Sequence, residues 1–419
     1  MSYFVINKSE DLSGVIKVQG AKNLILPLMA AALLSEGITI FENCPDISDV
    51  RYTIKILEGF GCRVDFYDST LSIDTRGFNP CNIGSKYSEK MRSSFLFMGA
   101  LLSKCKTAKL SMPGGCNIGR RPIDIHLKAF REMGVKIAED RDEIFADARY
   151  LRDAYIKLDF PSVGATENVI LLAVKSNVHI VLDNIAREPE IKEMCNILNK
   201  MGAKICWESD SRIEIYGVDK LKPVRARVMG DRICAGTYIT AVGLCGGDVI
   251  ISGIDNNSLL GMSDIFLRMG IEITNNSKDS IRVRCNRRTT NLTSIHTEPF
   301  PGFPTDIQSP LMVLASVSMG TVRLTENLFE NRFRIVNELN RMGADIKVEN
   351  NVAIINGVDS LRGTDVRATE LRGGAALVLA GMVANGVTRI TGIQYIARGY
   401  ENILNDLNKI GGKIVCHME

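Results

Sequence analysis

Residues 112–122 bring together the groups of this chain that are best suited to chemistry on a phosphorylated substrate. Two glycines precede Cys116. Because glycine has no side chain, such a loop can adopt backbone conformations with positive φ and can pass close to a ligand. Arg120 and Arg121 follow, and their guanidinium groups suit a phosphate, which they bind through paired hydrogen bonds. The pattern predicts a reactive thiol beside an anion-binding site. Taken alone, it fits a surface hairpin with a chance cysteine equally well.

The composition is that of a globular protein with room for two cores. The chain has 419 residues, of which 45% are hydrophobic and 24% are charged. Its 51 basic and 48 acidic residues give a net charge of +3, which is too balanced for a non-specific nucleic-acid binder. Residues 1–8 lack the features of a signal peptide, and no apolar run reaches the roughly 18 residues that cross a bilayer. These observations predict a cytoplasmic protein that binds neither nucleic acid nor membrane.

The cysteines and histidines are placed irregularly along the chain. There are 11 cysteines, no two of them in a Cys-x-x-Cys motif, and the 4 histidines are isolated from one another. An odd number of cysteines without export signals favours reduced thiols, most of them small core residues. The chain also lacks the glycine patterns of Walker and dinucleotide-binding loops. The sequence therefore predicts no metal site and no cofactor.

A short signature, a hydrophobic residue followed by glycine and an alternating strand, recurs six times. Each copy follows a helix-like apolar stripe, as at residues 126–133, so it indicates a helix that ends at glycine and leads into a strand. Upstream of each copy lies an Ala- and Leu-rich helix and then a β-branched strand, as at residues 28–34 and 38–41. The chain is therefore predicted to be an α/β repeat protein. The six glycines are Gly61, Gly134, Gly202, Gly270, Gly343 and Gly411.

The spacing of these glycines groups the six units into two halves of three. The intervals are 73, 68 and 68 residues, and then 73 and 68. The first twenty residues contain a strand pair that is expected to complete the C-terminal half. The predicted domains are residues 21–229, which carry the Cys116 loop, and residues 1–20 together with 230–419.

Charged or polar residues recur at the start of each Ala- and Leu-rich helix in the same register. If the helices of a domain point the same way, their positively polarised N-termini meet on one face and form an anion trap with these side chains. Solvated helix caps would account for the same residues. The six aligned positions are Lys22, Arg92, Ser162, Arg232, Asp306 and Arg372.

The chain resembles the UDP-N-acetylglucosamine 1-carboxyvinyltransferases, the enolpyruvyl transferases of peptidoglycan synthesis, over essentially its whole length. The resemblance is carried by short motifs that occur in the family's order. They include the Pro-Gly-Gly-Cys run that ends at Cys116 and the Phe-Pro-Thr-Asp run that ends at Asp306. The matching residues are 20–23, 46–50, 91–94, 113–116, 121–122, 162–168, 186–190, 231–232, 303–306, 326–332, 371–372 and 398–401.

The resemblance implies the family's fold and reaction. The fold is a two-domain inside-out α/β barrel with three βαβαββ-type repeats per domain, six in all, and an active site in the cleft between the domains. The reaction transfers the enolpyruvyl group of phosphoenolpyruvate to the 3'-hydroxyl of UDP-N-acetylglucosamine and releases phosphate, by addition and elimination through a tetrahedral ketal. It is the first committed step of peptidoglycan precursor synthesis. No cofactor is implied, and a monomer is expected.

The resemblance also implies roles for particular residues. Cys116 is expected to be the general acid that protonates C3 of phosphoenolpyruvate, since a thiol with an ordinary pKa of about 8.5 is mostly protonated at neutral pH. The same thiol is expected to form covalent adducts with the substrate or with an epoxide such as fosfomycin. Asp306 is expected to act on the sugar hydroxyl as general base or orienting acceptor, although a helix N-cap would also explain it. Lys22 and Arg398 complete the expected catalytic set.

Two groups of binding residues follow from the same resemblance. For phosphoenolpyruvate they are Lys22, Asn23, Arg121, Arg332, Arg372 and Arg398. For UDP-N-acetylglucosamine they are Arg92, Arg121, Pro122, Ile123, Asp124, Ile125, Ser162, Val163, Gly164, Asp306 and Leu328.

The chain departs from the family pattern at two positions and leaves three alternatives open. Glu370 stands where the family commonly has Asp, and Cys234 stands where it commonly has Glu, which we interpret as lineage variation or rate tuning.

The sister enzyme 5-enolpyruvylshikimate-3-phosphate synthase shares the fold and the donor, but it lacks a cysteine in the loop that carries Cys116. A sensor that binds the nucleotide sugar without turnover is the second alternative, and a thiol-redox protein is the third.

Overall fold

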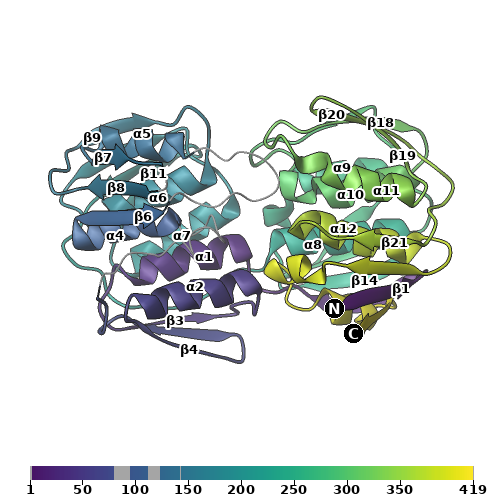
Figure 1. Ribbon diagram of the computed structural model, residues 1–419, viewed down its shortest axis with the longest axis horizontal. Helices are drawn as coiled ribbons and strands as arrows, with labels where there is room; N and C mark the ends of the chain where they lie inside the picture. Colours follow the sequence, from purple (N-terminus) through teal and green to yellow (C-terminus); the bar gives the residue numbers. More distant parts are fainter. Residues whose placement is uncertain (1, 80–94, 112–122, 142, 419) are drawn as a thin grey trace. The chain divides into compact units, whose positions relative to one another are not determined.

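The computed structural model describes residues 2–79, 95–111, 123–141 and 143–418. The chain divides into two compact units (Figure 1). We call the unit that lies within residues 20–229 the N-terminal unit, and the unit formed by residues 1–19 and 230–419 the C-terminal unit. None of the helices in the described residues combines the length and the apolar composition of a bilayer-spanning helix.

The N-terminal unit alternates helices with short strands. Its described helices are α1 (Lys22–Ala32), α2 (Ser48–Gly59), α4 (Phe97–Cys105), α5 (Asp124–Glu132), α6 (Val163–Ala173) and α7 (Pro189–Lys200). Its described strands are β3 (Ile38–Glu42), β4 (Arg63–Tyr67), β5 (Thr70–Asp74), β6 (Thr107–Ser111), β7 (Lys136–Glu139), β8 (Glu143–Asp147), β9 (Ala154–Lys157), β10 (His179–Asp183), β11 (Lys204–Ser209), β12 (Arg212–Tyr216) and β13 (Arg225–Arg227).

The C-terminal unit follows the same plan and adds short 3-10 helices. Its α-helices are α8 (Arg232–Cys245), α9 (Met262–Met269), α10 (Gln308–Val317), α11 (Val336–Arg341), α12 (Leu371–Val383) and α13 (Ile403–Lys409). The 3-10 helices are η2 (Asn256–Leu259), η3 (Thr305–Ile307), η4 (Arg332–Ile335) and η5 (Ile393–Arg398). The strands are β1 (Tyr3–Asn7), β2 (Leu12–Lys17), β14 (Gly247–Ser252), β15 (Glu272–Ser277), β16 (Ser280–Cys285), β17 (Ser294–His296), β18 (Thr321–Thr325), β19 (Asp345–Glu349), β20 (Val352–Asn356), β21 (Asp365–Arg367), β22 (Thr388–Thr391) and β23 (Lys413–His417).

The strands of the described residues form six small sheets, three in each unit. In a typical repeat, such as β17-β18-β20-β19, the strand after the Ala- and Leu-rich helix pairs parallel with the strand before that helix and antiparallel with a hairpin. The glycine between the second helix and the hairpin has a positive φ in all six copies, from 81° at Gly61 to 108° at Gly411. The predicted helix–glycine–strand signature and the α/β class are therefore confirmed.

The first two strands of the chain belong to sheets of the C-terminal unit. β2 directly precedes α1 in sequence, yet it pairs parallel with β14 of the C-terminal unit. Conversely, β13 directly precedes α8 but pairs parallel with β3 of the N-terminal unit. β1 lies between β22 and β23 and pairs antiparallel with both, so it supplies the strand that the last repeat lacks.

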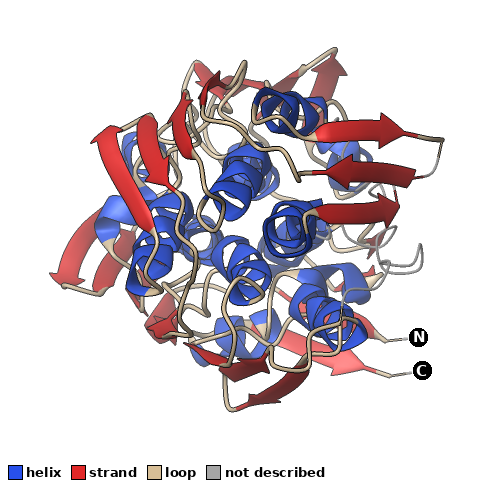
Figure 2. Ribbon diagram, turned by 90° about the vertical axis from the view of Figure 1, so that its left-hand side faces the viewer, coloured by secondary structure: helices blue, strands red, loops and turns tan. Residues whose placement is uncertain are grey.

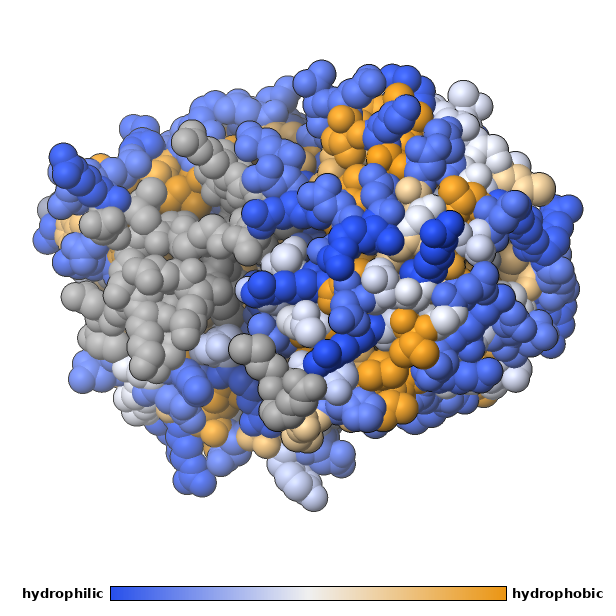
Figure 3. Space-filling view, turned by 45° about the vertical axis from the view of Figure 1, so that its right-hand side comes forward, coloured by the Kyte–Doolittle hydropathy of each residue, from blue (hydrophilic) through white to orange (hydrophobic). Residues whose placement is uncertain are grey.

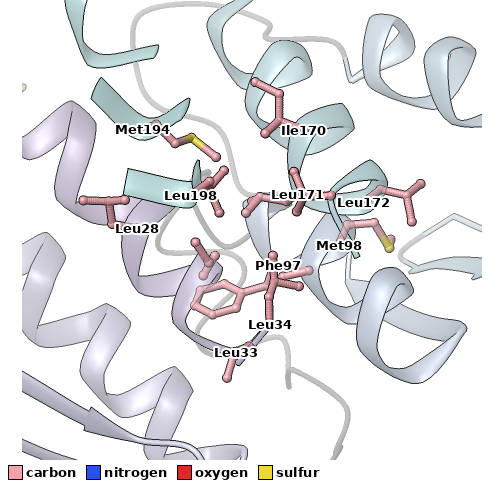
Figure 4. Packing of buried hydrophobic residues seen from close by; sticks show 14 of the residues in the cluster. Leu28, Leu33, Leu34, Phe97, Met98, Ile170, Leu171, Leu172, Met194 and Leu198 are labelled. Atoms are coloured by element: carbon pink, nitrogen blue, oxygen red, sulfur yellow. The ribbon is translucent and has the colours of Figure 1, made fainter. Parts of the chain in front are cut away.

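Each unit has its own hydrophobic core, which its helices fill. Residues 165–173 of α6 and residues 372–382 of α12 are buried on every side, as expected for helices whose whole circumference faces protein. The sheets lie outside the helices, as Figure 2 shows for the N-terminal unit, which faces the viewer. In that unit, Leu28, Phe97 and Leu171 belong to one packed cluster (Figure 4). The inside-out arrangement predicted from the resemblance is confirmed.

Most of the large hydrophobic side chains in the described residues are buried in these cores. On the face seen in Figure 3, hydrophilic residues dominate and hydrophobic residues form small, scattered patches. Single exposed apolar side chains of this kind are ordinary for a globular protein.

Candidate functional site

Asp306 lies in a tight turn at the beginning of α10. Pro304 leads into η3, Ile307 donates its backbone N–H to the Pro304 carbonyl at 3.0 Å, and the Ile307 side chain is fully buried. This anchoring leaves the Asp306 side chain one-quarter exposed. The turn therefore holds a carboxylate at the N-terminal end of a buried helix, where the helix dipole favours an anion.

Arg332 reaches the same turn from η4. Its guanidinium Nη2 donates to Asp306 Oδ1, and its Nε donates to the backbone carbonyl and the hydroxyl of Thr305, each at 3.3 Å. The Arg332 side chain is only 2% exposed and lies over the Phe329 ring. Arg332 is thus locked against the Asp306 turn by hydrogen bonds on one side and by an aromatic ring on another.

Arg372, the second residue of α12, binds the other oxygen of Asp306. Its Nη2 donates to Asp306 Oδ2 at 2.9 Å, and the side chain is 4% exposed. Its remaining terminal nitrogen, Nη1, is buried and has no hydrogen-bond partner among the described residues. Since a buried donor without a partner is costly, this nitrogen is suited to receive an anionic ligand.

Two buried guanidinium groups share the Asp306 carboxylate, and the carboxylate of Glu326 is linked to the same turn through the Thr305 hydroxyl. The ion pair also joins the beginnings of α10 and α12, as the shared register of the helix starts predicted. A small anion would supply an acceptor for the unused Nη1 of Arg372 beside two buried guanidinium groups.

Glu326 holds a second turn beside the Asp306 turn. It follows β18, is 3% exposed, and accepts the backbone N–H groups of Leu328 at 2.9 Å and Phe329 at 3.1 Å with one oxygen. Its other oxygen accepts the hydroxyl of Thr305 at 2.9 Å. Leu328 is thereby connected to the Asp306 turn through the Glu326 carboxylate.

Arg398 ends η5 and is half-buried. Two residues further on, Tyr400 is buried and its hydroxyl lies 2.7 Å from the Thr237 hydroxyl of α8. The Arg372 guanidinium stacks at 5.7 Å from the Tyr400 ring. The segment that carries Arg398 is therefore packed against Arg372.

The two departures from the family pattern lie in the same part of the C-terminal unit. Glu370 caps α12, accepting the backbone N–H groups of Arg372 at 2.7 Å and of Gly373. An aspartate can serve the same purpose, so the exchange preserves the cap. Cys234 is buried in α8, with its sulfur 3.9 Å from the Gly399 carbonyl oxygen.

In the N-terminal unit, Lys22 and Asn23 begin α1. A side chain at the preceding Gly20 would collide with the Asn43 carbonyl oxygen at 1.8 Å, so glycine is required for the chain to turn into the helix. The Lys22 ammonium lies 2.6 Å from a carboxylate oxygen of Asp49 in the first turn of α2. Both side chains are largely buried, at 12% and 4% exposure, so the ammonium is held in a defined place.

Ser162, Val163 and Gly164 begin α6. The Ser162 hydroxyl caps the helix by accepting the Ala165 backbone N–H at 3.3 Å. Gly164 packs against the ring of His126, and a side chain there would meet the ring at 3.0 Å. His126 is buried and lies 3.0 Å from the Asn168 amide, which ties α5 to α6.

The segment before His126 leads into α5. Ile123 is buried and immediately precedes the helix, Asp124 is exposed in its first turn, and Ile125 is partly buried. Four predicted site residues lie outside the described residues: Cys116, Arg92, Arg121 and Pro122. Their proposed roles stay predictions.

Three residues that contribute to this arrangement were not singled out from the sequence. Asp49, Thr305 and Glu326 each lie inside a matching motif, but they were not assigned a role there. The available signal was a carboxylate at a helix start for Asp49, and a carboxylate directly after a strand for Glu326. Within the described residues, no group of three or more His, Cys, Asp or Glu side chains is arranged to hold a metal ion.

Comparison with known proteins identifies relatives along the whole chain. Residues 6–407 match the family model described as EPSP synthase (3-phosphoshikimate 1-carboxyvinyltransferase). The chain is 42% identical to UDP-N-acetylglucosamine 1-carboxyvinyltransferase 2 of Caldanaerobacter subterraneus, over 99% of each protein. It is also 42% identical to UDP-N-acetylglucosamine 1-carboxyvinyltransferase of Finegoldia magna, over 99% of this chain and 98% of that protein.

Solved structures share the fold at lower sequence identity. The enolpyruvyl transferase NikO from Streptomyces tendae is 23% identical, with a TM-score of 0.89 over 100% of this chain and 99% of that one. An EPSP synthase from Acinetobacter baumannii is 17% identical, with a TM-score of 0.75 over 100% of both chains. These two likenesses concern the fold.

Proposed function

The chain belongs to the EPSP synthase family of enolpyruvyl transferases, and from this membership we propose its reaction. It transfers the enolpyruvyl group of phosphoenolpyruvate to the 3'-hydroxyl of UDP-N-acetylglucosamine and releases phosphate. The observation that carries the choice of acceptor is the 42% identity to a UDP-N-acetylglucosamine 1-carboxyvinyltransferase over 415 residues. The product serves peptidoglycan precursor synthesis.

The reaction requires one proton to be delivered and then removed at the same carbon. In the addition step, C3 of phosphoenolpyruvate is protonated while the sugar oxygen forms a bond to C2, which gives a tetrahedral ketal. In the elimination step, the bond from C2 to the phosphate oxygen breaks and C3 loses a proton. We assign delivery of the proton to the Cys116 thiol, whose thiolate is then available to take a proton back from C3, and acceptance of the sugar hydroxyl proton to Asp306.

Phosphoenolpyruvate suits the cationic cluster of the C-terminal unit. The unused Nη1 of Arg372 offers a donor to its carboxylate or phosphate, and Arg332 adds a second buried charge. Because Asp306 already binds both arginines, an anion that takes over part of their hydrogen bonding leaves the carboxylate freer to accept the sugar hydroxyl. Substrate binding would then prepare the acceptor site. The remaining proposed phosphoenolpyruvate ligands are Lys22, Asn23, Arg121 and Arg398.

The nucleotide sugar is assigned to polar and backbone groups at helix starts. The beginning of α6 at Ser162 presents backbone N–H groups that suit a diphosphate oxygen, and Gly164 lets the His126 ring pack closely against this helix start. The other proposed contacts are Arg92, Arg121, Pro122, Ile123, Asp124, Ile125, Val163, Asp306 and Leu328. We expect the protein to act on these small molecules in the cytoplasm, as a monomer.

A two-acceptor assay tests the proposal. Purified protein is incubated with phosphoenolpyruvate and either UDP-N-acetylglucosamine or shikimate 3-phosphate, while phosphate release and product mass are followed. We expect phosphate release and a product heavier by one enolpyruvyl group with the nucleotide sugar only. Turnover with shikimate 3-phosphate alone would assign the chain to the sister activity, and binding of the nucleotide sugar without phosphate release would make it a sensor.

The variant Cys116→Ser separates catalysis from binding. The hydroxyl is a far weaker acid than the thiol, so turnover should fall by at least about a hundredfold, the usual size of a general-acid contribution. Binding of UDP-N-acetylglucosamine, measured by calorimetry, should stay within about threefold. Unchanged turnover would remove Cys116 from the mechanism.

A further inference from the structure

We propose that Glu326 is a positioning residue that joins the turn of Leu328 to the turn of Asp306, and so sets how the nucleotide sugar meets the Asp306 carboxylate. The inference rests on the proposed function, because both turns matter through the substrate that they are assigned to bind. Nothing in the proposed reaction requires Glu326 to touch a substrate.

The two oxygens of Glu326 serve different turns. Oε1 accepts the backbone N–H groups of Leu328 and Phe329, at 2.9 and 3.1 Å, and so fixes the backbone of the Leu328 turn. Oε2 accepts the Thr305 hydroxyl at 2.9 Å, one residue before Asp306. Thr305 and Glu326 are 21 residues apart in the sequence, and the Glu326 side chain connects the two turns.

One chain of hydrogen bonds leads from Arg332 through the Thr305 hydroxyl to the Glu326 carboxylate. Arg332 Nε donates to the Thr305 hydroxyl at 3.3 Å, and that hydroxyl in turn donates to Glu326. Arg332 also donates to Asp306. Glu326, Thr305 and Arg332 are therefore linked to one another beside the Asp306 turn, with Glu326 as the carboxylate that accepts the Thr305 hydroxyl.

Glu326 is 3% exposed, and all of its hydrogen bonds described above go to protein groups. A carboxylate that accepts three donors while buried is fixed in one orientation, because each broken bond would leave a donor unsatisfied. This burial makes it a positioning residue and not a catalytic one.

A purely structural role would have different consequences from a positioning role. If Glu326 only stabilised the fold, its loss would lower the unfolding temperature while molecules that stay folded would keep their kcat/KM. If it positions the two turns, its loss should reduce kcat/KM for UDP-N-acetylglucosamine in fully folded protein. The two turns are held by separate oxygens, so the Thr305 bond can be removed without touching the Leu328 bonds.

The experiment is a double-mutant cycle with a matched control. Glu326→Gln places an NH₂ where one oxygen was, so the amide cannot accept from both turns. Thr305→Val removes the hydroxyl and keeps the side-chain shape, and Thr305→Ser restores the hydroxyl. Glu330→Gln makes the same chemical change at an exposed acid four residues further on. Circular dichroism and thermal unfolding establish that each variant is folded at the assay temperature.

We expect Glu326→Gln and Thr305→Val each to lower kcat/KM for UDP-N-acetylglucosamine by about tenfold or more. The double variant should lose little beyond either single variant, because both break the same connection. Thr305→Ser should recover activity to within about threefold of the parent, and Glu330→Gln should match the parent.

Three results would overturn the inference. One is that both single variants keep kcat/KM within twofold of the parent while folded. Another is that their effects multiply in the double variant. The third is that serine at position 305 fails to restore activity. If Glu326→Gln does not fold, the Thr305 pair decides. A parent protein that is inactive with UDP-N-acetylglucosamine would refute the proposed function and this inference with it, whereas an active parent with unaffected variants would refute the inference alone.

Discussion

At the scale of single residues, the Asp306 carboxylate is shared between two buried guanidinium groups. Arg332 binds one of its oxygens and Arg372 binds the other. Such a carboxylate is oriented with little freedom, which suits the acceptor of a sugar hydroxyl. It forms an ion pair with both arginines, so removing it affects both stability and catalysis.

The variant Asp306→Asn tests this double role. The amide keeps the shape but can accept from only one arginine, so two buried cations are left with less compensation. We expect kcat to fall by about a hundredfold or more, and the free energy of unfolding to fall by about 1–3 kcal/mol, less than for a fully buried pair. Steady-state kinetics and chemical denaturation measure the two effects. Activity within tenfold of the parent would exclude Asp306 from the chemical step.

Arg372 can offer a ligand more than its positive charge, because its Nη1 is buried and has no hydrogen-bond partner among the described residues. Arg372→Lys keeps the positive charge but loses the planar group that binds Asp306 and leaves Nη1 for a ligand. We expect the KM for phosphoenolpyruvate to rise at least about tenfold, which corresponds to about 1.4 kcal/mol of lost binding. The KM for UDP-N-acetylglucosamine should change less.

A matched exchange provides the control for this measurement. Arg288 forms a surface ion pair with the exposed Asp359, so Arg288→Lys should leave both KM values unchanged. An equal rise in both KM values for Arg372→Lys would contradict a specific role in binding the smaller substrate.

The sequence named Asp306, Arg332 and Arg372 as separate site residues, and it did not predict that they pair with one another. The repeat register aligned Asp306 with Arg372, and the motifs added Arg332. The hydrogen bonds that join them span 26 and 66 positions, and no local pattern specifies which oxygen meets which nitrogen. Asp49 and Glu326 were overlooked for the same reason, because their partners are defined only by the packing of separate helices and turns.

At the scale of elements, the Ala- and Leu-rich helices are buried all round, and this burial includes polar residues. α6 buries Glu167 together with its apolar neighbours. Burial, and then the nearby carboxylates of Glu188 and Glu190, raise the pKa of Glu167 well above its usual value. The sequence predicted a helix here, but it did not predict that the side chain of Glu167 is buried in it.

The shifted pKa of Glu167 gives stability a pH dependence whose sign can be derived. The folded protein holds a proton that the unfolded chain releases at the ordinary glutamic acid pKa of about 4.3. The free energy of unfolding should therefore decrease as pH rises from that value toward the folded-state pKa of Glu167, and this contribution should be constant above it.

The variant Glu167→Gln should remove this decrease and should be more stable than the parent at pH 8. Denaturant unfolding from pH 4.5 to pH 8 measures the difference between the two proteins. Glu58→Gln, at an exposed position of α2, is the control and should leave the pH dependence unchanged. Parallel curves for the parent and Glu167→Gln would contradict the assignment.

At the scale of the whole molecule, the repeats are not simply strung along the chain. β2 and β13 each pair in the unit opposite to the helix that they precede, and β1 completes the last repeat. The glycine periodicity predicted six units because the helix–glycine–strand junction is local. For the first twenty residues, the sequence led us to expect a strand pair in the C-terminal half. The pairing of β13 with β3 was not expected, since strand pairing depends on contacts between distant parts of the chain.

Folding into two cores also sorts the cysteines by reactivity. Burial raises the pKa of the Cys62 thiol to about 11 and that of the Cys195 thiol to about 12, whereas Cys206 and Cys416 are exposed. Since the thiolate is the nucleophile, iodoacetamide at pH 7.5 should label Cys206 and Cys416 quickly, and Cys62 and Cys195 only after unfolding.

Replacing the two exposed cysteines lets the labelling of Cys116, the proposed general acid, be followed without their signal. In the double variant Cys206→Ser/Cys416→Ser, we expect the fast labelling that remains to fall on Cys116, and phosphate release to disappear at the same rate as this thiol is consumed. Peptide mass spectrometry of timed samples, run beside the turnover assay, measures both. Serine at the two exposed positions should leave activity intact, because neither residue has a proposed part in the reaction. Full turnover after complete alkylation of Cys116 would contradict its proposed role as general acid. Rapid labelling of Cys195 in the folded protein would contradict the protection of this thiol by burial.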